Sequence, residues 1–143
     1  MREKLIIVSG YFNPIHKGHI EYFHLAKKYA DKLIVIINND YQRQIKGSSE
    51  FMNEKERLFI VKELKVVDEV LLSIDNDSTV IRSISKIHDM YSPQYEIIFG
   101  NGGDQNNENI PEKNICKKLK IKLIDGLGNK IQSSSWLIKK NES

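Results

Sequence analysis

The stretch that decides the fold is Gly10-Tyr11-Phe12-Asn13-Pro14-Ile15-His16-Lys17-Gly18-His19. Four consecutive aliphatic residues, Leu5 to Val8, lead directly into it. A helical pattern begins near Gly18 and places apolar residues at Ile20, Phe23, Leu25 and Ala26. The segment therefore predicts a strand, a turn and the start of a helix. In α/β sheets this is the place where ligands bind.

The residue types in this turn favour an anionic ligand. Free backbone N–H groups at a helix N-terminus attract negative charge. Two histidines three residues apart, His16 and His19, lie on the same face of the first helical turn. Between them, Gly18 leaves room for a phosphate to approach the backbone. The turn therefore predicts a polyphosphate site.

The pattern Gly-x-Phe-x-x-x-His-x-Gly-His after a hydrophobic strand resembles the HxGH signature of a nucleotidyltransferase superfamily. That superfamily includes glycerol-3-phosphate cytidylyltransferases and heptose-phosphate adenylyltransferases. The resemblance extends from Ile6 to about Leu137, with further matching motifs in the family's order. It implies a Rossmann-like fold and transfer of a nucleotidyl group to a phosphorylated metabolite, with release of pyrophosphate.

Aliphatic runs alternate with helical patterns along the chain, which predicts an α/β fold with a doubly wound, parallel, five-stranded sheet. We expect strands at about Lys4 to Ser9, Leu33 to Asn38, Glu69 to Ser73, Tyr95 to Phe99 and Ile121 to Ile124. We expect helices near Lys17 to Ala30, Asn53 to Leu64, Thr79 to His88, Pro111 to Leu119 and Ser133 to Lys140. Asn53 and Ser78 are expected to cap the second and third of these helices, and Pro111 suits a first helical turn. Two polar segments, 39–52 and 100–109, lack a clear period and are expected as loops beside the histidine turn.

The length indicates one domain over residues 1–143, which the resemblance identifies as a nucleotidyltransferase domain. The chain is 40% hydrophobic and 29% charged, as in ordinary globular proteins, and its formal charge of +3 is too small to indicate a nucleic-acid partner. The single cysteine, Cys116, excludes an internal disulfide and is expected to be a buried apolar residue. No apolar run reaches the roughly 18 residues that span a bilayer, and no signal peptide is recognised. We expect a cytoplasmic protein without a membrane partner.

The resemblance assigns roles to residues that match the family's motifs. His16 and His19 would donate hydrogen bonds to the charge that develops on the α-phosphate, and Lys46 would neutralise the departing pyrophosphate. Arg57 would bind a phosphate of the acceptor or the nucleotide, or alternatively form an ion pair on the helix surface. Arg43 is the alternative to Lys46. A zinc site is the competing interpretation of the histidines, but it lacks a third ligand at a recognisable spacing.

The remaining matches concern the nucleotide. Besides Gly10, Tyr11, Phe12 and Gly18 of the turn, the resemblance assigns nucleotide contacts to Gly102 and Asp104 in the Gly102-Gly103-Asp104 segment and to Ser133, Ser134 and Ser135. The family's arginine before the hydroxyl run is absent, and Lys130 stands near its place as a phosphate ligand. Trp136 either packs the last helix or stacks on a base.

We favour CTP over ATP as the nucleotide, because the short single-domain form resembles the glycerol-3-phosphate type. The alternative is an adenylyltransferase that uses ATP and a sugar phosphate, and it rests on the Gly-Gly-Asp segment. Two other classes are a non-catalytic nucleotide sensor and an RNA-binding module, and the small net charge argues against the second. The resemblance implies Mg²⁺ held mainly by the triphosphate, with no protein metal ligands, and a homodimer. The sequence does not identify the acceptor.

Overall fold

Five strands form one parallel sheet in the order β3-β2-β1-β4-β5 in the computed structural model, which describes residues 2–102 and 110–127. Each neighbouring pair of strands is parallel. The strands are β1 (Glu3–Gly10), β2 (Lys32–Ile37), β3 (Glu69–Leu72), β4 (Tyr95–Gly102) and β5 (Lys122–Leu127). The predicted fold class and the five predicted strands are confirmed, with ends that differ by at most a few residues.

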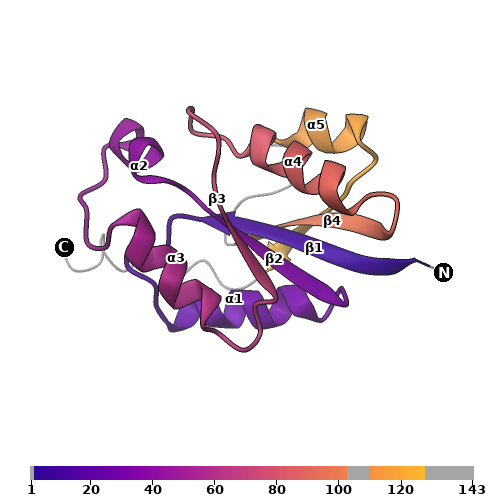
Figure 1. Ribbon diagram of the computed structural model, residues 1–143, viewed down its shortest axis with the longest axis horizontal. Helices are drawn as coiled ribbons and strands as arrows, with labels where there is room; N and C mark the ends of the chain where they lie inside the picture. The colour runs from indigo at the N-terminus through magenta and orange to yellow at the C-terminus, as the bar shows by residue number, and fades with distance from the viewer. Residues whose placement is uncertain (1, 103–109, 128–143) are drawn as a thin grey trace.

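Helices cover both faces of this sheet (Figure 1). The helices are α1 (Lys17–Lys27), α2 (Asp40–Lys46), α3 (Glu54–Lys62), α4 (Ile81–Tyr91) and α5 (Lys113–Lys118). One face packs against α1 and α3 through a core that includes Phe23 and Val61, and the other packs against α4 and α5 through Ile84 and Cys116. Because β1 is central and covered on both sides, its run from Leu5 to Val8 is fully buried.

The topology places the histidine turn at the ligand-binding position of the sheet. From β1 the chain proceeds outward to β2 and β3 on one side, whereas β4 and β5 lie on the other side. The direction of winding therefore reverses between β1 and β4, and ligands of such sheets bind outside the carboxyl ends of the strands at this point. The turn that follows β1 begins there. The short helix α2 lies at the same end of the sheet (Figure 1).

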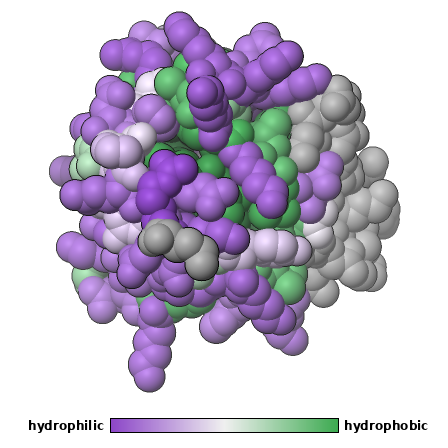
Figure 2. All heavy atoms as spheres, turned by 90° about the vertical axis from the view of Figure 1, so that its right-hand side faces the viewer, coloured by the Kyte–Doolittle hydropathy of each residue, from purple (hydrophilic) through white to green (hydrophobic). Residues whose placement is uncertain are grey.

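Figure 2 shows the opposite end of the molecule, where the strands begin and where apolar residues are visible within a frame of hydrophilic ones. A pocket at this end is lined by residues that include Arg2, Tyr95 and Lys120. Tyr95 is the first residue of β4, so this pocket is separated from the histidine turn by the length of the strands.

The expectations for residues 39–52 and for the cap of α4 are wrong. Residues 39–52 are not a loop throughout, because α2 forms within them, with Asn39 as its N-cap and Gly47 as a left-handed C-cap at φ 82°. Ser78 does not cap α4: the helix begins after Val80, which makes no side-chain cap. The buried Asp75 carboxylate instead accepts hydrogen bonds from the backbone N–H groups of Arg82 and Ser83.

Of the other local expectations, those for Asn53 and Cys116 are confirmed and that for Pro111 is wrong. Asn53 caps α3 as predicted, accepting a hydrogen bond from the Glu56 N–H. Cys116 is buried, as predicted. Pro111 does not lie in the first turn of α5, because it precedes the N-cap Glu112 and the helix begins at Lys113. The helix expected from Ser133 to Lys140 lies outside the described residues. Among the described residues, none of the helices has the length and apolar character needed to cross a membrane.

Candidate active site

The two motif histidines cap the start of α1 reciprocally. His16 is the N-cap residue in extended conformation, and its Nδ1 accepts a hydrogen bond of 3.0 Å from the Gly18 N–H. In return, His19 Nδ1 accepts a hydrogen bond of 3.1 Å from the His16 N–H. The two rings stack with their centroids 3.9 Å apart. Gly18 is buried in this turn, with its N–H directed to His16 rather than left free for a ligand.

These contacts fix the protonation of both rings. Because each Nδ1 is an acceptor, the neutral imidazole carries its hydrogen on Nε2. Burial lowers the pKa of His16, and burial together with the neighbouring His16 lowers the pKa of His19 to about 3. Both side chains are therefore neutral near pH 7 and carry an Nε2–H donor. Within the described residues, the buried Nε2 of His16 has no hydrogen-bond partner.

The buried ring of Phe12 packs against the histidine turn. Phe12 is only 3% exposed, adopts a positive φ of 52°, and packs edge-on against His19 and Phe23 with ring centroids 4.9 Å and 5.3 Å away. A Cβ on Gly10 would lie 2.8 Å from the Phe12 ring, so the close approach requires glycine. The Phe12 side chain is thus part of the core beneath the turn, and its contact with a nucleotide stays a prediction.

Lys46 reaches the histidine turn from α2. It is the last residue of that helix, and its Nζ lies 4.5 Å from the centroid of the Tyr11 ring. Burial of the ammonium group lowers the pKa of Lys46. Burial raises the pKa of the Tyr11 hydroxyl, against the opposing effect of the nearby Arg57 charge. The structure therefore brings Lys46 to Tyr11, which belongs to the same turn as the stacked pair His16 and His19. Arg43 instead donates to the Ser48 carbonyl.

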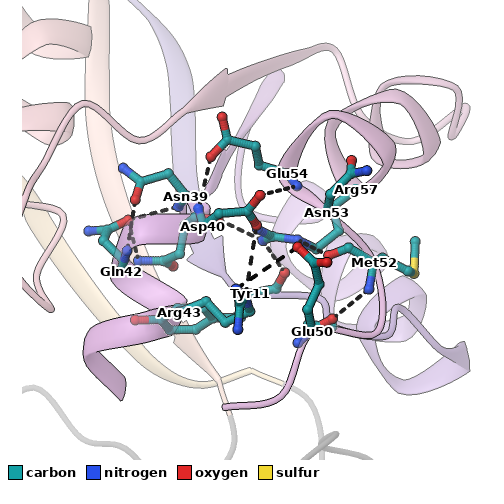
Figure 3. A network of polar contacts seen from close by, with 12 residues as sticks. Tyr11, Asn39, Asp40, Gln42, Arg43, Glu50, Met52, Asn53, Glu54 and Arg57 are labelled. Atoms are coloured by element: carbon teal, nitrogen blue, oxygen red, sulfur yellow. Dashed lines mark hydrogen bonds and ion pairs between the residues drawn. The ribbon is translucent and has the colours of Figure 1, made fainter. Parts of the chain in front are cut away.

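Arg57 does not lie where a phosphate ligand or a surface ion pair is expected. Its side chain is fully buried and makes four hydrogen bonds within the protein (Figure 3). Nε donates to the Met52 carbonyl, Nη1 to the carbonyls of Tyr11 and Asn38, and Nη2 to the Asp40 carboxylate at 2.8 Å. Four of its five donors are therefore used internally. The ion pair with Asp40 exists, but it is an internal one.

Sequence reasoning missed Asn13, which connects the histidine turn to the segment before α3. This residue is 8% exposed; its amide N donates to the Ser49 carbonyl at 2.7 Å, and its amide O accepts from the N–H groups of Phe51 and Met52 at 2.9 Å. Asn13 thus holds residues 49–52 against the turn. An asparagine within a turn offers no sequence signal for such a distant contact.

A second missed feature joins the starts of α2 and α3. The Asp40 N–H donates to Glu54, and the Glu54 N–H donates to Asp40. One signal was available: Asn39 followed three residues later by Gln42 is a capping-box pattern, and both halves of that box form. The pattern identifies the start of α2 but not the exchange with α3.

The end of β4 is also packed closely. A Cβ on Gly102 would lie 2.9 Å from the Leu127 carbonyl oxygen and 2.9 Å from the Tyr22 ring. The Tyr22 hydroxyl donates to the Gly100 carbonyl. Glycine at position 102 is therefore required by its protein neighbours. The other predicted nucleotide and phosphate ligands, Asp104, Lys130, Ser133, Ser134 and Ser135, lie outside the described residues, as does Trp136.

The described residues contain no group of three or more histidine, cysteine, aspartate or glutamate side chains that could hold a metal ion. In the histidine pair, both Nδ1 atoms accept hydrogen bonds from backbone N–H groups, so neither Nδ1 is available to bind a cation. The Nε2–H of His16 is a donor, which suits a phosphate oxygen better than a cation.

Comparison with known proteins agrees with this geometry. A family model described as cytidylyltransferase-like matches residues 7–135, which is most of the chain. The chain belongs to the cytidylyltransferase-like family. The resemblance inferred from the HxGH pattern is thereby confirmed.

Individual members of the family and a solved structure extend the comparison. The chain is 39% identical over 72 residues to the FAD synthase of Picrophilus torridus, covering 50% of this chain and 52% of that protein. It is 38% identical over 110 residues to the bifunctional protein HldE of Blochmanniella floridana, covering 76% of this chain and 21% of that protein. The chain thus spans about half the length of the first relative and about a fifth of the second.

A crystal structure of the lipopolysaccharide core biosynthesis protein from Thermoplasma volcanium superposes with a TM-score of 0.67 at 26% identity, covering 86% of this chain and 95% of that one. The similarity to this structure therefore includes the three-dimensional arrangement of the sheet as well as the sequence motifs. Neither named relative is a cytidylyltransferase by name, so these similarities do not support the expected preference for CTP over ATP.

Proposed function

We propose that this protein is an adenylyltransferase that joins the adenylyl group of ATP to a phosphorylated small metabolite and releases pyrophosphate. The observation that carries the proposal is the pair of neutral, stacked histidines at the switch point of the sheet, in the same turn whose Tyr11 ring contacts the Lys46 ammonium. Such a set of donors matches the oxygens of a triphosphate.

Two considerations favour ATP over CTP. The product named by the first relative, flavin adenine dinucleotide, contains an adenylyl group joined to the phosphate of a flavin nucleotide. The segment Gly102-Gly103-Asp104 also resembles that of heptose-phosphate adenylyltransferases. A CTP-dependent reaction is the second candidate, and the description of the family model favours it.

In the proposed reaction, an oxygen of the acceptor's phosphate attacks the α-phosphorus of ATP. A new P–O–P linkage forms, the bond between the α-phosphorus and its bridging oxygen breaks, and pyrophosphate leaves with the electron pair. The attacking phosphate is already largely ionised near neutral pH, so no general base is needed. Catalysis consists of positioning and of stabilising the charge that develops on the phosphate oxygens.

The chain's own residues divide this work. His16 and His19 donate from Nε2 to the α-phosphate, and Lys46 neutralises the leaving pyrophosphate. The backbone around Gly10 and Tyr11 lines the nucleotide's approach to the turn. When bound to the triphosphate, Mg²⁺ would add charge neutralisation, with no ligand from the described residues required. The family resemblance adds Gly102, Asp104, Ser133, Ser134, Ser135 and Lys130 as nucleotide and phosphate contacts, and a homodimer. The single cysteine, Cys116, favours a place in the reducing cytoplasm.

The test is pyrophosphate release in the presence of Mg²⁺, with ATP, CTP, GTP or UTP each paired with a panel of phosphomonoesters. The panel includes a flavin mononucleotide, sugar phosphates and glycerol phosphate. We expect release with ATP and at least one acceptor. Release with CTP alone would select the second candidate. Nucleotide-dependent thermal stabilisation without any release would instead indicate the nucleotide sensor.

A further inference from the structure

Arg57 is the only arginine or lysine among the fully buried side chains of the described residues. It lies in α3 and reaches segments that are distant in sequence. Its guanidinium bonds the Tyr11 carbonyl in the histidine turn and the Asn38 carbonyl at the end of β2. Burying a cation is costly unless hydrogen bonds and an opposite charge compensate it, and here both are present. The arrangement is therefore a specific junction between the turn and α3.

Asp40 connects this junction to α2. Its Oδ1 accepts from Arg57 at 2.8 Å, while its Oδ2 accepts from the Glu54 N–H at the start of α3 at 3.1 Å. Since Asp40 is the first residue of α2, its bonds fix where that helix begins. Figure 3 shows Asp40 between the ends of the two helices, with Arg57 directed toward it.

The C-terminal end of α2 also contacts the histidine turn. Lys46 is the last residue of that helix, and its ammonium lies over the Tyr11 ring. Tyr11 is held by its carbonyl to Arg57 and contacts Lys46 by its ring. The junction of Arg57 and Asp40 thus fixes the positions of both the histidine turn and the N-terminus of α2, the helix that carries Lys46.

We propose that Arg57 and Asp40 form a positioning pair that places the Lys46 ammonium, through α2 and the Tyr11 ring, beside the histidine turn. The proposal rests on the proposed function, in which Lys46 neutralises the leaving group. Neither member of the pair contacts the substrate in this account. Their contribution to the rate passes through Lys46.

A double-mutant cycle measures this dependence. Asp40→Asn removes the charge at nearly constant shape and lowers kcat/KM for ATP, by about tenfold, in the otherwise unchanged protein. In a Lys46→Ala background the same substitution changes kcat/KM by less than about twofold, because the group that it positions is absent. Glu69→Gln is the matched control, since Glu69 pairs with Lys32 on the strands away from the turn. It leaves kcat/KM unchanged in both backgrounds.

A second pair of variants keeps the test valid if Asp40→Asn does not fold. Tyr11→Leu removes the ring beneath Lys46 but keeps the carbonyl that Arg57 bonds, and it lowers kcat/KM only where Lys46 is present. Tyr11→Phe, which retains the aromatic face beneath Lys46, is the comparison, and it loses less kcat/KM than Tyr11→Leu.

Equal losses in the presence and absence of Lys46 would overturn the inference while leaving the proposed function intact. Absence of pyrophosphate release in the unsubstituted protein, with every nucleotide and acceptor, would reject the proposed function and this inference with it.

Discussion

Replacing His16 by asparagine separates the two tasks that its imidazole performs. The Nδ1 atom caps α1 by accepting from the Gly18 N–H, and the Nε2–H is the proposed phosphate donor. An asparagine carries its amide oxygen near the position of Nδ1 and is among the best N-cap residues, so the cap survives. It has no atom near Nε2. His16→Asn therefore removes the donor and keeps the helix start.

The expected magnitudes follow from this separation. Loss of one donor to a developing oxyanion costs about 2.7–4 kcal/mol of transition-state stabilisation, or ~10²–10³ in kcat. The free energy of unfolding of His16→Asn stays close to that of the unsubstituted protein. His16→Ala loses the cap as well and is destabilised by about 1 kcal/mol. His16→Gln returns an N–H near the Nε2 position without the cap, so it recovers part of the rate while remaining destabilised.

The measurements are initial rates of pyrophosphate release near neutral pH and urea unfolding of each variant. A rate for His16→Asn within a few-fold of the unsubstituted protein would refute the assignment of Nε2–H as the donor. A loss of stability as large as that of His16→Ala would refute the capping argument instead.

Three further predictions follow from contacts around the site and core. Gly10→Ala forces the Phe12 ring away from its present position, which costs about 1–3 kcal/mol of stability. Because Phe12 packs against His19, the same change displaces His19 and lowers kcat. The control is Gly126→Ala, which strains the backbone at a site with no close neighbours among the described residues and lowers stability without changing kcat. The pKa of His19 falls from 6.5 to about 3 on folding. Between pH 6.5 and about pH 3, the unfolded state therefore binds a proton on His19 that the folded state does not bind. The free energy of unfolding consequently declines as the pH falls from 6.5 to about 3. His19→Asn flattens this decline in acid titrations followed by circular dichroism. Ser83→Ala removes a buried hydroxyl bonded to Asp75 and destabilises the protein by about 1–3 kcal/mol in urea unfolding, with kcat unchanged.

The sheet was predictable because its strands are short apolar runs. Leu5 to Val8 is buried on both faces, and burial on both faces produces a continuous aliphatic segment rather than an alternating one. The histidine turn was predictable for a related reason, since a strand that ends in glycine and a helix that begins with a capping side chain leave local signals. Both signals come from residues that are neighbours in the sequence, so they can be recognised without knowing the fold.

The features that escaped prediction depend on distant partners. The helix α2 has seven residues and exposes both Tyr41 and Ile45, so it lacks an apolar stripe and is held by its caps and by the exchange with Glu54. Arg57 looked like a surface or ligand-binding residue because arginines usually are. Its burial depends on hydrogen bonds to carbonyl groups of two other segments. No local sequence pattern indicates these distant contacts.

The most direct test of the central claim is to follow the phosphorus of ATP itself. We would record ³¹P spectra of the protein with ATP, Mg²⁺ and an acceptor that supports pyrophosphate release. The account predicts that pyrophosphate and a new P–O–P product, joining the α-phosphate of ATP to the acceptor's phosphate, appear in equal amounts, and that His16→Asn slows both together. Formation of ADP and inorganic phosphate without that product would contradict it, since the bond broken would then be at the γ-phosphate.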